Sequence, residues 1–407
     1  MRHDVIIIGG GQAGSMLSIA LRQNKYSGSI LLVSNECHIP YQRPPLSKNF
    51  LTDNTSIESL YFKSSSYYKK NQIDMLLNSH VISINKGRKS ISLKEGKELY
   101  YDKLVIATGS KLNKVGLKSA NDETYLLKTI DDSVKIRSLL DKQQEIAIVG
   151  AGYIGLEIAA AAIKKNNRVV IIEADSRVMS RSVCPETSQF YESIHKKEGV
   201  KFFFNSLVKD IDQNNNEKII SLDSHESIKT EQVIVGVGVK PRVKIALEAD
   251  LDCRDGILVN EFCQTSDDSI YAIGDCANYP NSIYNLRLRL ESVQNAIEHA
   301  KIAAAKISEI ELANHQIPWF WSDQYDIKLR IAGINMGYEN YVFRGNIDEE
   351  KFSVFYMKED RIIAVETIND NKSFALSKKL IKDQVSIPLD VIKDKDSDLK
   401  IFLNEVV

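Results

Sequence analysis

Two short glycine-rich stretches decide the fold, Gly9-Gly10-Gly11-Gln12-Ala13-Gly14 and Gly150-Ala151-Gly152-Tyr153-Ile154-Gly155. Each follows a run of apolar residues typical of a buried parallel strand, Asp4 to Ile8 and Glu145 to Val149, and each opens a helix-like stretch. Glycines here let the backbone approach a pyrophosphate, which rests on the N–H groups of the helix N-terminus. One such motif is a weak sign, but two in one chain predict two nucleotide cofactors and therefore electron transfer between them.

An acidic residue follows the second strand of each unit. After the strand Ser29 to Val33, Glu36 is the carboxylate in place to bind a ribose. After Arg168 to Ile172, Glu173 ends the strand directly. A carboxylate there accepts hydrogen bonds from both ribose hydroxyls and repels a 2′-phosphate, so the second site favours NAD over NADP. Arg177, four residues later, leaves the strictness of that preference open.

Composition excludes several classes of protein. The 407 residues, 43% of them hydrophobic, are enough for several domains. The 53 Lys and Arg nearly cancel the 54 Asp and Glu, which argues against a nucleic-acid-binding protein. No apolar stretch approaches the roughly 20 residues that span a bilayer, and the short apolar run near the N-terminus is expected to be a strand and not a signal peptide. We expect a cytoplasmic protein with no membrane segment.

The five cysteines are scattered along the chain. None forms a Cys-x-x-Cys pair, which excludes by spacing a dithiol redox centre, a zinc knuckle and a cysteine-ligated iron–sulfur cluster. We therefore predict no metal site. The cysteines are Cys37, Cys184, Cys253, Cys263 and Cys276.

The texture of the sequence changes after Pro318. Strand-like stretches rich in aromatic and β-branched residues precede a final helix at about Asn371 to Asp383, which predicts a separate α+β domain. The charge-rich tail after Pro388 is expected to fray. The strands are expected at Ile327 to Ile334, Tyr341 to Arg344, Phe352 to Met357 and Ile362 to Ile368.

A set of further motifs gives the chain a family resemblance. They are Arg43-Pro44-Pro45-Leu46-Ser47-Lys48, Ala107-Thr108-Gly109, Gly155-Leu156-Glu157, Tyr271 to Asp275, Arg289 to Val293 and Pro318 to Tyr325. In this order they resemble the oxygenase-coupled NADH-dependent ferredoxin reductase family, which includes putidaredoxin reductase, rubredoxin reductase and the ferredoxin reductase components of aromatic-ring dioxygenases. The resemblance covers Val5 to about Pro388.

The resemblance implies an α/β, glutathione-reductase-like flavoprotein with two Rossmann-like dinucleotide-binding domains and a C-terminal α+β interface domain. The implied FAD-binding domain comprises residues 1–112 and 243–317. Residues 113–242 form the implied NAD-binding domain, and residues 318–407 the interface domain.

By position, the resemblance also assigns cofactor-binding residues. Those for FAD are Gly9, Gly11, Ala13 and Gly14 at the pyrophosphate, Asn35 and Glu36 at the ribose, Val81 at the adenine, Asp275 at the ribitol, Lys48, Val293 and Trp321 at the flavin ring, and Arg43, Ala107, Thr108, Gly109, Lys128, Gly274 and Ser292 around them. Those for NAD are Gly150, Gly152, Tyr153, Ile154, Gly155, Glu157, Glu173 and Gly238.

Two positions depart from the family pattern. Asn35 stands where the family often has Asp, so either Asn35 or Glu36 makes the ribose contact. Lys128 stands where the family usually has Arg, which replaces a planar fork by a point charge.

The implied reaction is an NADH-dependent ferredoxin reductase reaction, in which hydride passes from the nicotinamide to the flavin. The proposed catalytic residues are Lys48 and Glu157, expected as an ion pair, and Trp321 at the flavin edge. The implied acceptor is a [2Fe–2S] ferredoxin that serves a cytochrome P450 or a Rieske-type oxygenase. An acidic ferredoxin would dock on a basic rim, with Arg287, Arg289, Lys301, Arg330 and Lys378 as candidates.

Three alternatives stay open. The chain could reduce rubredoxin instead. It could be a flavin NADH oxidase, peroxidase or disulfide reductase, but that chemistry needs a redox cysteine where Ser47 and Lys48 stand. A signalling or nucleic-acid-binding flavoprotein resembling apoptosis-inducing factor fits the balanced charge less well.

Overall fold

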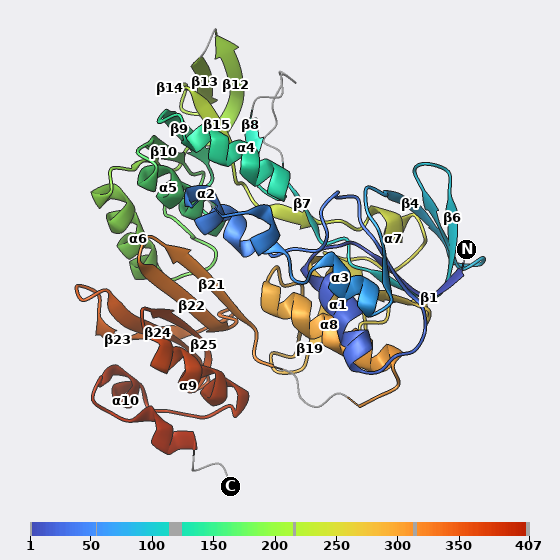
Figure 1. The fold of residues 1–407 in the computed structure, drawn as a ribbon. Helices are drawn as coiled ribbons and strands as arrows, with labels where there is room; N and C mark the ends of the chain where they lie inside the picture. The colour runs from blue at the N-terminus through green and yellow to red at the C-terminus, as the bar shows by residue number, and fades with distance from the viewer. Residues whose placement is uncertain (1, 54, 114–123, 215–216, 312–315, 404–407) are drawn as a thin grey trace. The chain divides into compact units, whose positions relative to one another are not determined.

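The computed structural model describes residues 2–53, 55–113, 124–214, 217–311 and 316–403 (Figure 1). The chain forms two compact units. Unit 1 consists of Met1–Gln42, Ile57–Lys111 and Lys240–Gln316, and unit 2 of Arg43–Ser56, Leu112–Val239 and Ile317–Val407. The chain passes from one unit to the other after Gln42, Ser56, Lys111, Val239 and Gln316. Two of these points lie in the paired strands β7 (Ser110–Leu112) and β16 (Val239–Pro241).

Unit 1 is built on a sheet with the strand order β3-β2-β1-β6-β5-β4, and β18 also pairs with β6. The pairs that involve β1, β2, β3 and β18 are parallel, whereas β5 pairs antiparallel with β6 and with β4. Val5, Ile6 and Ile7 of β1 are fully buried, as expected for a central parallel strand. The strands are β1 (Arg2–Ile8), β2 (Ile30–Val33), β3 (Ile73–Leu76), β4 (Val81–Asn85), β5 (Ser90–Leu93), β6 (Glu98–Ile106) and β18 (Ile270–Ala272).

Two helices that are distant in sequence pack together in unit 1, α1 (Gln12–Gln23) and α8 (Val293–Ile307). The buried face of α8 carries Ala296, Ala300 and Ala303, whose small side chains let another helix approach closely. The other elements of unit 1 are η2 (Ile57–Leu60), α3 (Ser65–Lys70), α7 (Lys244–Leu247), β17 (Ile257–Leu258), η3 (Gly274–Cys276), β19 (Ala277–Asn281) and β20 (Leu286–Leu288).

Unit 2 contains the second strand–turn–helix unit, in a parallel sheet with the order β11-β10-β9-β15-β8. The predicted strands at 145–149 and 168–172 and the helix that begins at Tyr153 are confirmed. The elements are β8 (Thr124–Leu126), α4 (Ile130–Leu140), β9 (Glu145–Val149), α5 (Tyr153–Lys164), β10 (Arg168–Ile172), α6 (Pro185–Lys197), β11 (Lys201–Phe203), β12 (Val208–Asn214), β13 (Glu217–Leu222), β14 (Ser227–Thr230) and β15 (Gln232–Val235).

The proline-rich segment Arg43–Ser56 belongs to unit 2, although unit 1 precedes and follows it in sequence. It forms η1 (Pro44–Ser47) and α2 (Asn49–Thr52), and α2 packs against α4 and α5. Pro44 and Pro45 open η1, where their missing N–H groups cost no internal hydrogen bond. Lys48 stands at the N-cap of α2.

The C-terminal part of unit 2 is an antiparallel sheet with the order β21-β22-β25-β24-β23, and α9 packs against it. The tail beyond Pro388, which we expected to fray, instead forms α10 and η4. There Ile392 and Leu399 are buried, and apolar burial holds the tail down. The elements are β21 (Trp319–Gln324), β22 (Ile327–Gly333), β23 (Asn340–Asn346), β24 (Lys351–Lys358), β25 (Arg361–Ile368), α9 (Asn371–Lys382), α10 (Leu389–Lys393) and η4 (Leu399–Leu403).

Alanine substitution should affect stability differently at the two glycines of the α5 turn, Gly152 and Gly155. A Cβ on Gly155 would lie 2.1 Å from the carbonyl oxygen of Gly150, so Gly155→Ala should destabilise the protein by about 1–3 kcal/mol despite the better helix propensity of alanine. A Cβ on Gly152 meets nothing within 4 Å, so Gly152→Ala should change the free energy of unfolding by less than about 0.5 kcal/mol. Urea unfolding of both variants checks this, and equal midpoints would contradict the steric argument.

Candidate functional site

The two glycine turns are built to receive an anion. The N-caps of α1 and α5 are Gly11 and Gly152, and neither supplies a side-chain hydrogen bond to the first turn of its helix. The amides that a capping side chain would otherwise bind are therefore left to a ligand. Gly9, with φ +120°, lies against the backbone of Ala107, so a side chain has no room there. Both turns fit the pyrophosphate of a dinucleotide.

The acid at the second turn is held by backbone amides. Glu173 accepts hydrogen bonds from the N–H of Ala151 at 2.5 Å and from that of Asp175 at 2.9 Å. The guanidinium of Arg177 donates to the carbonyl groups of Ser180 and Val183 and to the hydroxyl of Ser188. Because these contacts tie Arg177 to its own loop, Glu173 sets the charge at this turn.

The predicted residues of unit 1 lie at the ends of strands and at the starts of helices. Glu36 accepts a hydrogen bond from Tyr41, and the neighbouring Asn35 is exposed. Asp275, in η3, accepts a hydrogen bond from Ser110 at 3.0 Å. Val81, Ala107, Thr108, Gly109, Gly274, Ser292 and Val293 are distributed over β4, the end of β6, η3 and the start of α8.

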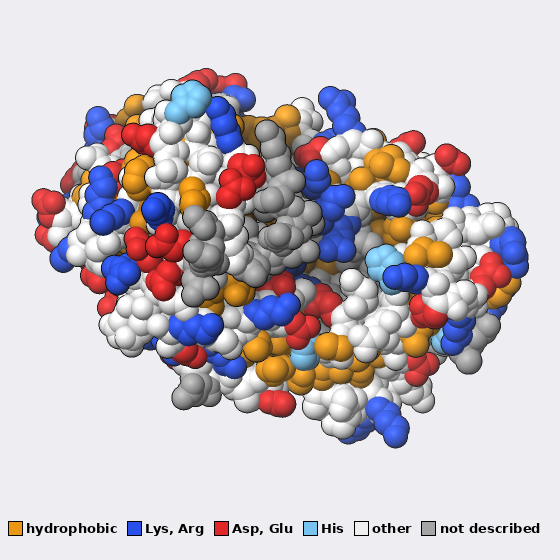
Figure 2. All heavy atoms as spheres, turned by 90° about the horizontal axis from the view of Figure 1, so that it is seen from above, with side chains coloured by type: hydrophobic (Ala, Val, Ile, Leu, Met, Phe, Trp, Pro, Cys, Tyr) orange, Lys and Arg blue, Asp and Glu red, His pale blue; other side chains and the backbone are white. Residues whose placement is uncertain are grey.

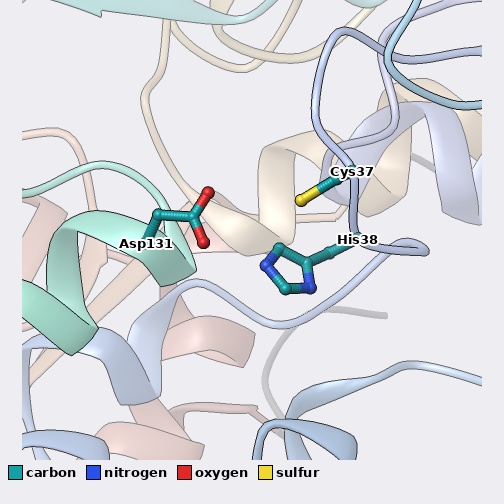
Figure 3. A group of neighbouring side chains, drawn as sticks. All are labelled: Cys37, His38 and Asp131. Carbon is teal, nitrogen blue, oxygen red and sulfur yellow. The ribbon is translucent and has the colours of Figure 1, made fainter.

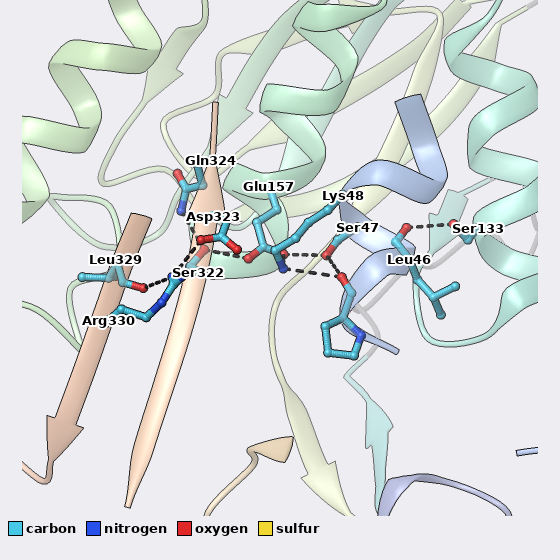
Figure 4. Close-up of polar contacts among 11 residues, drawn as sticks. Leu46, Ser47, Lys48, Ser133, Glu157, Ser322, Asp323, Gln324, Leu329 and Arg330 are labelled. Carbon is cyan, nitrogen blue, oxygen red and sulfur yellow. Dashed lines mark hydrogen bonds and ion pairs between the residues drawn. The ribbon is translucent and has the colours of Figure 1, made fainter. Parts of the chain in front are cut away.

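Lys48 and Glu157 form the ion pair expected from the sequence, with 2.7 Å between Lys48 Nζ and Glu157 Oε2 (Figure 4). Their side chains are only 17% and 4% exposed, so water screens the pair weakly. Ser47 also donates to Glu157 Oε2, and Ser322 of β21 donates to Oε1 at 2.6 Å. Each oxygen of this buried carboxylate therefore has a donor, as a buried charge requires.

Hydrogen bonds with residues at the start of α4 hold the segment that carries Lys48. Ser133 of α4 donates to the carbonyl of Leu46 at 2.7 Å, and Arg43 donates to the carbonyl of Lys128. The amide of Lys128 in turn donates to Asp132, which completes the capping box of α4 with Thr129. Lys128 thus contacts Arg43 through its backbone, and these hydrogen bonds do not involve its ammonium group.

Alternation along β21 sends its side chains to two different sets of partners. Phe320 packs on Tyr153 with ring centroids 4.6 Å apart, and Ser322 and Gln324 bond to residues of α5 and α6. On the other face the rings of Trp319 and Trp321 lie 5.3 Å apart, and Phe374 of α9 contacts Trp319. The sequence motifs included Ser47, Ser322 and Gln324, but their spacing gave no sign of these contacts.

Three of the candidate basic residues are already paired. Arg289 bonds Asp255 and Glu291, Arg330 bonds Asp323, and Arg287 donates to the carbonyls of Val259 and Asn278. Lys301 is exposed, and the ammonium of Lys378 lies over the rings of Trp319 and Phe374. On the face drawn in Figure 2, basic and acidic side chains are interspersed.

One group of potential metal ligands, Cys37, His38 and Asp131, is drawn in Figure 3. Cys37 and His38 belong to unit 1 and Asp131 to unit 2. The three side chains therefore define no ligand set within either unit, and we assign no metal to them.

A second buried carboxylate belongs to Glu366 of β25, which is 1% exposed. It accepts hydrogen bonds from the hydroxyl of Tyr356 and from the amide of Cys184. Burial raises the pKa of Glu366 to about 7 and that of the Cys184 thiol to about 12. Cys184 is therefore a protonated cap of α6 and not a nucleophile.

No helix among the described residues is both long and apolar enough to cross a membrane.

Comparison with known proteins assigns the two parts of the chain to described families. A model of the pyridine nucleotide-disulphide oxidoreductase family matches residues 3–300, and a reductase C-terminal model matches residues 319–403. The chain is similar to putidaredoxin reductase CamA of Pseudomonas putida, with 36% identity over 98% of this chain and 96% of that protein. It is 37% identical to a rubredoxin-NAD(+) reductase of Pseudomonas putida, over 90% of this chain and 95% of the relative.

Among solved structures, the chain resembles the reductase in a covalent putidaredoxin reductase–putidaredoxin complex. The TM-score is 0.94 at 34% identity, with 99% of this chain and 98% of the other covered. The expected α/β flavoprotein fold, with two dinucleotide-binding units and a C-terminal α+β part, is confirmed.

The raised pKa of Glu366 predicts a pH dependence of stability. Because its folded-state pKa, about 7, lies above its ordinary value of 4.5, its contribution to stability is full below that ordinary value and is lost as the pH rises through about 7. Glu366→Gln keeps an oxygen acceptor but cannot ionise. The urea midpoint of the wild type, relative to that of the variant, should therefore fall between about pH 5 and about pH 8. A constant difference across this range would contradict the assignment.

Proposed function

Because the chain belongs to the NADH-dependent ferredoxin reductase family, we propose that its electron acceptor is a small [2Fe–2S] ferredoxin. As a member of that family it is an oxidoreductase that uses FAD and NAD(H). FAD, which the turn at Gly9, Gly11 and Gly14 would hold, would supply uptake of hydride from NADH and release of single electrons. The ferredoxin would in turn serve a cytochrome P450 or a Rieske-type oxygenase.

The observation that carries this proposal is the Lys48–Glu157 pair. A disulfide reductase needs a redox cysteine in this stretch, but Ser47 and Lys48 stand there and both contact Glu157. Cys184, Cys263 and Cys276 are buried, and burial raises the pKa of each thiol. This supports electron release without a sulfur intermediate. The similarity to a putidaredoxin reductase that was solved in complex with putidaredoxin supports a redox-protein partner of the same kind.

We propose that the remaining site residues act as the family pattern suggests. Lys48 supplies a fixed positive charge beside the flavin, Glu157 holds that charge, and Trp321 shields the flavin edge. The glycine turns bind the two pyrophosphates, and Glu173 selects NADH by its contact with the ribose hydroxyls. We also propose domain boundaries at residues 112, 242 and 317. A cytoplasmic location is proposed as well, because all five cysteines carry free thiols, as is usual in a reducing compartment.

For docking we propose a local contact and not a broad basic field. Three of the candidate arginines already donate to carbonyls or carboxylates of their own unit, namely Arg287, Arg289 and Arg330. Lys378 lies over Trp319, so a carboxylate that pairs with Lys378 would lie close to the aromatic pair of β21. Lys301, in unit 1, is exposed and is the second candidate that we propose for docking.

A coupled assay tests the proposed acceptor. NADH should bleach the purified yellow protein, and cytochrome c reduction should rise at least about tenfold when a [2Fe–2S] ferredoxin is added, more than with a rubredoxin. Because Lys301 is exposed and Lys378 is half-buried, solvent ions reach the docking charges, and the rate should fall as salt is raised above about 0.1 M. A rate that ignores both the ferredoxin and the salt would refute the proposed acceptor.

Lys48→Met tests the role of the ion pair. Flavin reduction by NADH, followed by stopped-flow absorbance, should slow by about tenfold or more while FAD stays bound, because a partly buried charge within the site is lost. The substitution leaves Glu157 as an unpaired buried charge, which is itself destabilising. The double variant Lys48→Met/Glu157→Gln removes both charges and should fold better while reducing flavin as slowly. An unchanged rate in either variant removes Lys48 from the mechanism.

A further inference from the structure

A chain of hydrogen bonds runs inward from Tyr325 to Glu157. Tyr325 OH lies 3.1 Å from His195 Nδ1, and His195 Nε2 lies 2.9 Å from Gln324 Oε1. Gln324 Nε2 donates to Ser322 Oγ at 3.2 Å, and Ser322 donates to Glu157 Oε1 (Figure 4). His195 and Ser322 are fully buried, and Gln324 is 1% exposed.

The Glu157 end of this chain determines which group donates and which accepts in every bond. The carboxylate of Glu157, paired with the Lys48 ammonium, can only accept, so Ser322 must donate to it. The oxygen of Ser322 then accepts from the amide nitrogen of Gln324, which places the amide oxygen of Gln324 against His195. His195 Nε2 must therefore carry the proton, and its bare Nδ1 accepts from the hydroxyl of Tyr325.

One further observation agrees with this direction, and another concerns the placement of Tyr325. Burial lowers the pKa of His195 to about 4, so its ring is neutral at physiological pH and has a single N–H to donate. Tyr325 lies in the turn between β21 and β22 with a φ of +52°, a region that residues other than glycine rarely occupy. That turn carries the phenol back to His195, and the bond to the imidazole offsets part of the backbone cost.

We propose that Ser322, Gln324, His195 and Tyr325 form an oriented chain of hydrogen bonds that fixes the charge and rotamer of Glu157, and through Glu157 the position of Lys48. They are positioning residues. Donors that all point toward Glu157 add their dipoles in its favour. With Oε1 held by Ser322, Oε2 stays turned toward Lys48. The importance of this for electron transfer rests on the proposed function, but the chain itself does not.

The tautomer of His195 tests the chain without any activity measurement. In flavin-loaded protein labelled with 15N-histidine, long-range 1H–15N spectra should show His195, identified by the signal lost in His195→Gln, as the Nε2–H tautomer. In Glu157→Gln the amide oxygen must turn toward the Lys48 ammonium, which can only donate, and this leaves an amide N–H facing Ser322. Donor and acceptor then exchange roles in each bond of the chain. His195 Nε2 would accept from Gln324 and Nδ1 would donate to Tyr325, so His195 should become the Nδ1–H tautomer.

Several outcomes would overturn the proposal. The wild type could show Nδ1–H, or Glu157→Gln could leave the tautomer unchanged. Gln324→Leu breaks the chain of hydrogen bonds. In the Gln324→Leu protein, the additional substitution Glu157→Gln should therefore leave the His195 signals unchanged. If the signals still shift, coupling through Gln324 is contradicted. Ser377→Ala is the matched control, because it removes a buried hydroxyl that donates to the carbonyl of Ser373 within α9, and the tautomer should not change.

The rate of flavin bleaching by NADH supplies the second readout. Ser322→Ala should lower the rate at saturating NADH by about tenfold, because a hydrogen bond to a charged group is lost, and Ser322→Thr should restore most of it. Equal rates for Ser322→Ala and wild type would refute the positioning role. If NADH fails to bleach even the wild type, the proposed function is wrong, and the tautomer result still decides whether the chain exists.

Discussion

The buried carboxylate of Glu157 is the constraint around which unit 2 is arranged. Taking a carboxylate and an ammonium out of water is costly, and the cost is offset only when both groups find partners of good geometry. Lys48 and Ser47 from the proline-rich segment supply partners to one oxygen, and Ser322 of β21 supplies one to the other. One side chain of α5 therefore holds together three segments that are far apart in the sequence.

This arrangement explains why the segment Arg43–Ser56 packs with unit 2 although unit 1 flanks it in the chain. Pro44 and Pro45 stiffen its start, and Arg43 and Leu46 anchor it to α4 through backbone carbonyls. Lys48 is then held at the N-cap of α2 with little freedom to leave Glu157. A point charge fixed in this way needs no reorganisation during a reaction, which is what electrostatic stabilisation requires.

Charge in this protein is used locally. The net charge is −1, and several arginines that appeared free in the sequence are bound within their own unit. Arg177 is an instructive case, because its position near Glu173 left the cofactor preference open. Its contacts with Ser180, Val183 and Ser188 show that it staples a loop.

The sequence by itself determined the two strand–turn–helix units, the α+β C-terminal part and the Lys48–Glu157 pair. Glycine turns and continuous apolar strands depend on residues that are close together in the sequence, so the sequence pattern alone predicts them. The Lys48–Glu157 pair followed from the family resemblance. Ser322, Gln324, His195 and Tyr325 could not be connected in this way, because α6 and β21 meet only when the C-terminal sheet packs on α5. The order of the tail was missed for the same reason, since Ile392 and Leu399 are buried by the fold and not by their neighbours in sequence. Only tertiary packing decides which polar side chains become buried together, and burial is what forces each of them to find a partner.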